Sequence, residues 1–140
     1  MNPVVFPAYR YHAGRLAGSG PATVSVHTVS GRYLGPLPHH LWHSPDGFQW
    51  GYHGSGPAEL ARCLLLHAVG SAAYCPHCNP TERVPYPGDP DRSCPHCHRG
   101  LDAAIIDYPI YKTNILAPLT APRWTTTSSA VRAHQRIIAR

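Results

Sequence analysis

The chain has 140 residues, of which 43% are hydrophobic, so it is long enough for one compact core and too short for two ordinary domains. Sixteen prolines and 12 glycines interrupt most stretches, charged residues make up only 14%, and the net charge of +5 is too small for a histone-like protein. Given this length, we expect one domain over residues 1–140. No window approaches about 20 consecutive apolar residues, and the start lacks a basic segment followed by an apolar one, so we expect the protein to be located in the cytoplasm.

Two segments rich in β-branched and aromatic residues open the chain. Residues 4–13 and 21–30 are predicted to pair as a hairpin with a loose turn. In the second segment Val24 and Val26 alternate toward the core, with His27 or Val29 as the next inward position. Prolines and the turn that begins at Ser44 then predict short strands within residues 32–52.

The most regular element is a helix predicted over residues 57–69. Pro57 suits the first helical position, Glu59 places a negative charge in the first turn, and Gly70 is a natural stop. Apolar residues occupy a broad face with some on other sides, so the helix is expected to be covered on more than one side. Cys63 within it is interpreted as a buried apolar residue.

The loop before this helix contains Gly54, Ser55 and Gly56. Backbone N–H groups at a helix start can hold an anion, so the loop is a candidate for binding a nucleotide-like ligand. It lacks the lysine of a phosphate-binding P-loop, and Glu59 would repel a phosphate. We therefore favour a role for the glycines in a sharp turn and close packing.

Two identical CPHC motifs carry the most specific chemical signal. Cys75 and Cys78 form one CxxC turn and Cys94 and Cys97 the other, with 15 residues between them. This spacing predicts a structural site in which four thiolates surround zinc and leave no open position for water. Bound thiolates would lower the net charge to about +3. Iron bound by the same four cysteines remains an alternative to zinc. Disulfide bonds between these cysteines are less favoured, because the sequence lacks an export signal.

Two further apolar segments follow the cysteines. Residues 103–116 are predicted to form a helix, or two short pieces interrupted near Pro109. Residues 128–140 are predicted to form an amphipathic helix whose N-cap comes from the preceding threonine and serine run. On that helix Arg132, Arg136 and Arg140 would form a basic stripe able to meet phosphates, although a solvated outer face is the commoner reason for such a stripe.

Other candidate site residues carry weaker signals. His39, His40 and His43 flank Trp42, but no cysteine is near them in sequence, so a solvated or packing role is favoured over a second metal site. The sequence contains no HExxH motif, paired carboxylates or convincing Ser–His–Asp set. We therefore expect a protein that is not an enzyme.

Several segments resemble a family of small bacterial, archaeal and phage proteins, domain-of-unknown-function family six-one-six-six. The resemblance lies in WGYHGSGPAELARCLL, YPIYKTNILAPL, RWTTTSSAVRAHQRII and the early YRYHAG. It leaves out residues 74–99, which therefore read as an inserted zinc-ribbon-like finger. Tyr111 departs from the phenylalanine expected before Lys112. The family brings no established activity, so the resemblance implies a fold and a phage or mobile-element setting.

These observations together predict an α+β fold in which a small antiparallel sheet packs against two or three helices and carries an inserted four-cysteine loop. The predicted function is that of a zinc-binding adaptor for nucleic acid or protein. The alternative is a protein that binds a nucleotide-like small ligand at the glycine-rich helix start. No membrane partner is expected.

Overall fold

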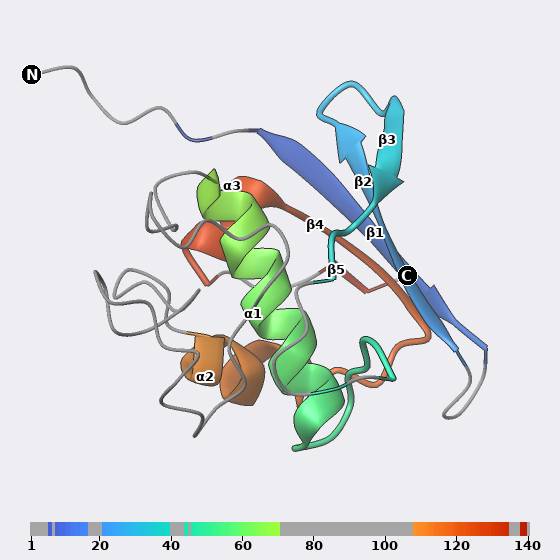
Figure 1. Ribbon diagram of the computed structural model, residues 1–140, viewed down its shortest axis with the longest axis vertical. Coiled ribbons are helices and arrows are strands. Elements are labelled where there is room, and N and C mark those ends of the chain that lie inside the picture. The colour runs from blue at the N-terminus through green and yellow to red at the C-terminus, as the bar shows by residue number, and fades with distance from the viewer. Residues whose placement is uncertain are drawn as a thin grey trace, which may run out of the picture.

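The computed structural model describes residues 6, 8–16, 21–39, 44, 46–70, 108–134 and 138–139. Within these residues an antiparallel sheet forms one layer and the helices lie together on one side of it (Figure 1). This arrangement confirms the predicted α+β class, with a small antiparallel sheet and a few helices. The predicted four-cysteine finger at 74–99 lies outside the described residues.

The sheet has five strands in the order β3-β2-β1-β4-β5. Their bounds are β1 Tyr9–Arg15, β2 Ala22–Thr28, β3 Tyr33–Pro36, β4 Arg123–Thr127 and β5 Ile138–Ala139. The predicted hairpin is confirmed, because β1 pairs antiparallel with β2. β1 also pairs with β4, so a strand from the end of the chain lies beside the first strand.

Alternation along the strands divides the sheet into a buried and an open face. The buried positions are Tyr11, Ala13, Val24, Val26, Trp124 and Thr126. Val24 and Val26 therefore point inward as predicted, whereas Val29 is exposed and His27 is half-buried. Successive side chains in a strand point to opposite sides, so the residues between these positions form the opposite face.

The helix α1 (Ser55–Val69) supplies the centre of the helical layer. The predicted helix over 57–69 is confirmed, with two more residues at its start. Gly70 ends it with a φ of 72°, a conformation that glycine adopts without strain. Thirteen of its 15 residues are buried, Cys63 among them, which confirms that the helix is covered on more than one side.

The second predicted helical segment consists of two short pieces in its described part. These are α2 (Tyr108–Tyr111) and the π-helical turn η3 (Lys112–Leu116), which follow each other directly. Pro109 is the second residue of α2, so it lies at a helix start, where its missing N–H leaves no bond unmade. Residues 103–107 lie outside the described residues.

The prediction of a helix over 128–140 is wrong. The helix α3 (Ser128–Arg132) has only five residues, and His134 beyond it has a φ of 53°. Ile138 and Ala139 then pair with Thr125 and Trp124 as β5. The start of the helix was predicted correctly, because the Thr127 side chain caps it by accepting a hydrogen bond from the Ala130 N–H.

Among the described residues, no helix combines the length and the apolar character that crossing a bilayer would require.

Candidate functional site

The four predicted metal ligands cannot be placed. Cys75, Cys78, Cys94 and Cys97 all lie outside the described residues, so the zinc site stays a prediction. In the described part of the chain no three His, Cys, Asp or Glu side chains cluster in a way that could hold a metal ion.

The glycine-rich helix start is filled by neighbouring side chains. A Cβ atom at Gly54 would lie 2.6 Å from Tyr52 Cε2, and one at Gly56 would lie 2.8 Å from both Gln49 Cβ and the Tyr52 hydroxyl. Tyr52 and Gln49 thus pack directly over the first helical turn. Ser55 is exposed and Gly54 makes no side-chain cap. This packing favours the interpretation of the glycines as a device for close contact.

Glu59 is wholly buried rather than placed at the exposed end of the helix dipole. Its Oε2 lies 3.0 Å from His39 Nε2 and accepts a hydrogen bond from the Ser44 N–H at 2.9 Å. The pair ties the segment before the helix to α1. His39 therefore has a packing role, as the sequence favoured, while His40 and His43 lie outside the described residues.

Arg132 is held by the protein itself. Its Nη1 donates to the Ala68 carbonyl oxygen at 2.8 Å, and its guanidinium lies 4.8 Å from the centre of the Phe6 ring. The stripe predicted with Arg136 and Arg140 depended on a continuous helix, which ends at Arg132. Those two arginines lie outside the described residues, so their contact with an anion stays a prediction without the helical spacing that suggested it.

The open side of the sheet brings together polar residues that were not predicted as a site, and His27 among them was predicted only as an alternative inward position. We call this surface the outer sheet face, and define it by the residues of β1, β2 and β4 whose side chains alternate with the buried positions, together with Tyr33 of β3, whose ring contacts His27. Its members are Arg10, His12, Gly14, Thr23, Ser25, His27, Tyr33, Arg123, Thr125 and Thr127. All ten are exposed or half-buried, and none is acidic.

The strand register arranges these residues in rows across the sheet. At one end Thr127 pairs with Arg10, Arg10 with His27 and His27 with Tyr33. The middle row joins Thr125, His12 and Ser25, and the row at the other end joins Arg123, Gly14 and Thr23. An exposed arginine therefore stands at each end of the outer sheet face.

Three rings from adjacent strands contact one another on this face. His12 of β1 lies 4.3 Å from His27 of β2, and His27 lies 5.5 Å from Tyr33 of β3, between ring centres. We call these residues the ring ladder. Ser25 lies beside it, with its Oγ 2.8 Å from His27 Nε2 and donating to the His12 carbonyl oxygen at 3.2 Å. The serine thus fixes the orientation of the His27 ring.

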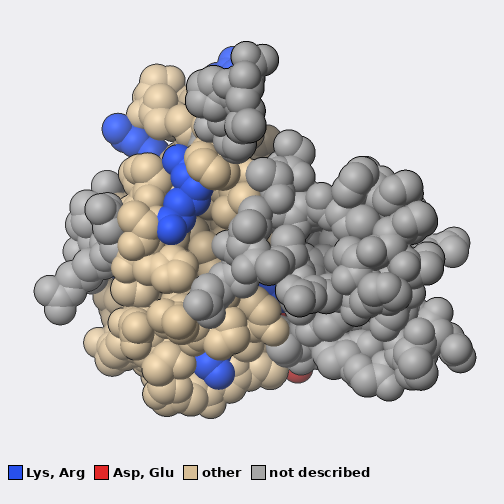
Figure 2. Space-filling model, turned by 90° about the vertical axis from the view of Figure 1, so that its left-hand side faces the viewer, with Lys and Arg blue, Asp and Glu red and all other residues tan. Residues whose placement is uncertain are grey.

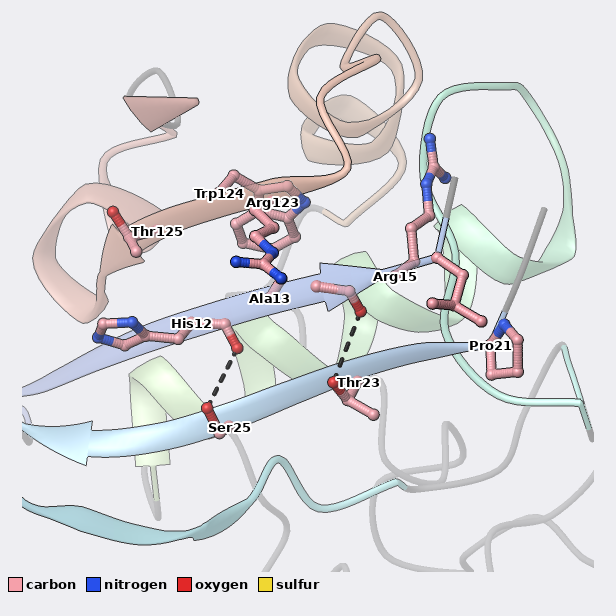
Figure 3. Close-up of a pocket in the computed structure, with 11 residues that line it drawn as sticks. His12, Ala13, Arg15, Pro21, Thr23, Ser25, Arg123, Trp124 and Thr125 are labelled. Atoms are coloured by element: carbon pink, nitrogen blue, oxygen red, sulfur yellow. Dashed lines mark hydrogen bonds between the residues drawn. The ribbon is translucent and has the colours of Figure 1, made fainter. Parts of the chain in front are cut away.

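A shallow groove of about 540 Å³ runs along the outer sheet face beside the ring ladder. Figure 3 shows His12, Ser25, Thr125 and Arg123 along it, from three neighbouring strands, with the helical layer behind the sheet. Arg15 lines its end but is already engaged: Nη1 donates to Gln49 Oε1 at 3.0 Å and to the Trp50 carbonyl oxygen at 2.7 Å. The guanidinium also stacks over the Trp50 ring. Arg15 is therefore a structural residue.

Charge is distributed unevenly along the chain. The described residues include seven basic side chains (Arg10, Arg15, Arg32, Arg62, Lys112, Arg123 and Arg132) and two acidic ones (Asp46 and Glu59). The other five acidic residues fall within 71–107. Since Glu59 is buried, Asp46 is the one exposed carboxylate among the described residues. The described residues thus carry a net charge of +5, which equals the net charge of the whole chain.

Figure 2 views the molecule from the side on which α2 and α3 lie in Figure 1. The lysine and arginine side chains on that side form separate groups divided by uncharged surface. On this side of the molecule, the described surface therefore shows no continuous basic stripe.

The outer sheet face was not predicted from the sequence, because hydrophobic alternation identifies the inward positions of each strand. The signal was present as the complementary alternation: Thr23, Ser25 and His27 in one segment, Arg123 and Thr125 in another. Which of these residues become neighbours depends on the register, and the strand β4 was not predicted at all.

Residues 11–79 match the family model described as "Family of unknown function (DUF6166)". The match supports the predicted resemblance over β1, β2, β3 and α1. It extends through Cys75 and Cys78, so it overlaps the segment interpreted as an insertion, and it ends before the two C-terminal segments of the resemblance. No curated protein and no solved structure matches the chain.

Proposed function

We propose that the protein is a non-enzymatic nucleic-acid-binding protein that uses the outer sheet face as its interface. The observation that carries the proposal is the composition of this face. Exposed Arg10 and Arg123 stand at its two ends, imidazole and hydroxyl groups lie between them, and it contains no carboxylate. Arginine, serine and threonine are among the side chains that contact phosphate oxygens in nucleic-acid complexes.

The same composition favours nucleic acid over a protein partner. The buried centre of a stable protein interface is apolar and aromatic, with few charges. On the outer sheet face Tyr33 is the one large apolar side chain, and the rest are polar, charged or glycine. Protein contact through the segment 74–99 remains a second part of the adaptor hypothesis, supported by the sequence of that segment.

We include a structural zinc ion in the proposal, held by Cys75, Cys78, Cys94 and Cys97. Its support is the sequence spacing alone. Four thiolates would fill the coordination sphere, so the ion would brace the loop rather than activate a water molecule. The cytoplasmic location and the phage or mobile-element setting belong to the same proposal and rest on the sequence and on the family resemblance.

Binding of labelled nucleic acid tests the function directly. We would measure fluorescence anisotropy with a single strand and a duplex of mixed sequence at several salt concentrations. The double substitution Arg10→Ala and Arg123→Ala removes two phosphate contacts, so the slope of log K against log salt should fall by about 1.5. Lys112→Ala, which removes one charge from the helical layer, is the matched control and should leave affinity within about twofold.

Two outcomes would contradict the proposal. One is the absence of binding to either probe at low salt. The other is equal loss of affinity from Lys112→Ala and from the outer-face substitutions, which would indicate general attraction to a basic protein. A co-purified nucleotide-like compound without binding to a polymer would support the alternative ligand-binding function instead.

A further inference from the structure

We infer that the outer sheet face accepts single-stranded nucleic acid, with unpaired bases stacked on the ring ladder of His12, His27 and Tyr33. This inference rests on the proposed function and specifies its ligand. The ring ladder is the feature that the charge of the face does not explain, because arginines alone would suffice to hold a phosphate backbone.

The first support is the position and exposure of the rings. They come from three adjacent strands, β1, β2 and β3, and contact each other in sequence across the sheet. Tyr33 at the end of the ladder is 61% exposed, and His12 and His27 are half-buried. Proteins that bind single strands hold bases on exposed aromatic and histidine rings, often on a sheet surface, where two or three bases stack in succession.

The second support is the placement of the charges relative to the rings. Arg10 lies directly beside His27 in the register, and Arg123 lies beside Gly14, four residues further along β1. Four residues of extended strand span about 13 Å. Arg10 can therefore meet the backbone beside the rings of His27 and Tyr33, and Arg123 can meet it further across the sheet on β4, beyond His12.

The third support concerns what a duplex would require. Proteins commonly read a duplex by inserting an exposed helix or a two-stranded ribbon into the major groove. In the described part of the chain α1 is almost wholly buried, α3 has five residues and α2 has four. None of these helices can enter a groove, and β2 and β3 belong to the five-stranded sheet rather than to a free two-stranded ribbon. The bases of a single strand, by contrast, can reach a broad sheet surface.

The test compares one 12-nucleotide sequence, made as RNA and as DNA, as a single strand and as a duplex. The protein should bind the single strand at least about tenfold more tightly than the duplex. Tyr33→Leu keeps an apolar side chain but removes the ring, and it should weaken single-strand binding by about tenfold. Tyr33→Phe keeps the ring and should retain affinity, and His27→Ala should behave like Tyr33→Leu.

The controls separate this inference from the proposed function. Leu34→Ala changes another exposed apolar residue of β3, on the opposite side of the strand from Tyr33, and should leave binding unchanged. If the ring variants bind like the wild type and duplex binds equally well, while Arg10→Ala and Arg123→Ala still weaken binding, the single-strand inference is wrong and the proposed function stands. If the wild-type protein binds neither probe, both are wrong. Thermal melts of each variant establish that it is folded.

Discussion

At the scale of single residues, two buried tyrosines differ in what their hydroxyl groups contact. Tyr11 and Tyr111 are both 0% exposed. The Tyr11 hydroxyl lies 2.8 Å from His67 Nδ1, whereas the Tyr111 hydroxyl has no hydrogen-bond partner among the described residues. Burial raises the pKa of Tyr111 well above its ordinary value of 10. Comparing the two residues therefore measures how much a buried hydroxyl group contributes to the free energy of unfolding, with and without a hydrogen-bond partner.

Tyr111→Phe should leave the free energy of unfolding unchanged or raise it by about 1 kcal/mol, because it removes a buried polar group without breaking a hydrogen bond. Tyr11→Phe should lower it by about 1 kcal/mol, because the histidine loses its partner. Urea unfolding at pH 7 measures both. The opposite order of the two effects would contradict the contacts assigned to these hydroxyls.

The pKa shift of Tyr111 adds a pH dependence. A raised pKa in the folded state means that the unfolded chain loses this proton first, so stability falls as the pH rises above about 10. Tyr111→Phe should reduce that alkaline loss relative to the wild type, whereas Tyr11→Phe serves as the comparison for removing a hydroxyl elsewhere in the core. Equal alkaline loss in the wild type and Tyr111→Phe would show that Tyr111 is not the group responsible.

At the scale of elements, α1 and the first hairpin were predicted correctly because α1 carries clear start and stop signals at Pro57 and Gly70, and because Val24 and Val26 alternate toward the core. Helical periodicity gave a wrong prediction for the C-terminal segment, residues 128–140. Its helical wheel was clean, but Ile138 and Ala139 gain strand hydrogen bonds from β4, a partner that no local pattern reveals. The threonine and serine run after Trp124 predicts helix caps, and Thr127 is one, but Arg123–Thr127 also alternates between buried residues and exposed or half-buried ones and forms the strand β4.

The loop that leads into α1 depends on Gly51. Its φ is 91°, its N–H donates to the Leu116 carbonyl oxygen, and an added Cβ would lie 2.9 Å from the Leu119 carbonyl oxygen. Gly51→Ala should therefore lower stability by about 1–3 kcal/mol, through both strain and backbone contact.

Gly14→Ala is the matched control for this change. A Cβ at Gly14 would meet only Arg123 Cγ, at 3.9 Å, so stability should stay unchanged or rise by about 0.5 kcal/mol. Chemical denaturation of both variants measures the difference. If the two substitutions had equal effects, the close approach at Gly51 would not be what fixes this loop.

At the scale of the whole molecule, composition predicts a mildly basic single domain. The net charge does not show, however, that the acidic residues are distributed unevenly along the chain. Five of the seven acidic residues fall within 71–107, so the described sheet and helices carry a net charge of +5, equal to that of the whole chain, on fewer residues. The arginine stripe was sought on a helix, while the exposed arginines of the sheet became neighbours of histidine and threonine only through register. Register is a property of the folded sheet, which is why the candidate site could not be assembled from the sequence.

The zinc prediction also belongs to this scale. Purified protein should contain about one zinc ion per chain, and removal by a chelator should lower its thermal stability. Cys75→Ser with Cys94→Ser should abolish the bound metal. Cys63→Ala, in the buried face of α1, should retain it. Metal analysis of the wild type, the double cysteine variant and Cys63→Ala tests this prediction. A wild-type protein without metal would contradict the four-thiolate site.

The outer sheet face as the nucleic-acid interface is the central claim, and photo-crosslinking tests it most directly. A single strand that carries photoreactive thiouridine would be crosslinked to the wild-type protein, and the modified peptides would be located by mass spectrometry. We predict crosslinks within β1, β2, β3 and β4, above all at Tyr33 and at the residues flanking Arg10 and Arg123. Crosslinks confined to other segments, such as 71–107 or the helical layer, would contradict the account.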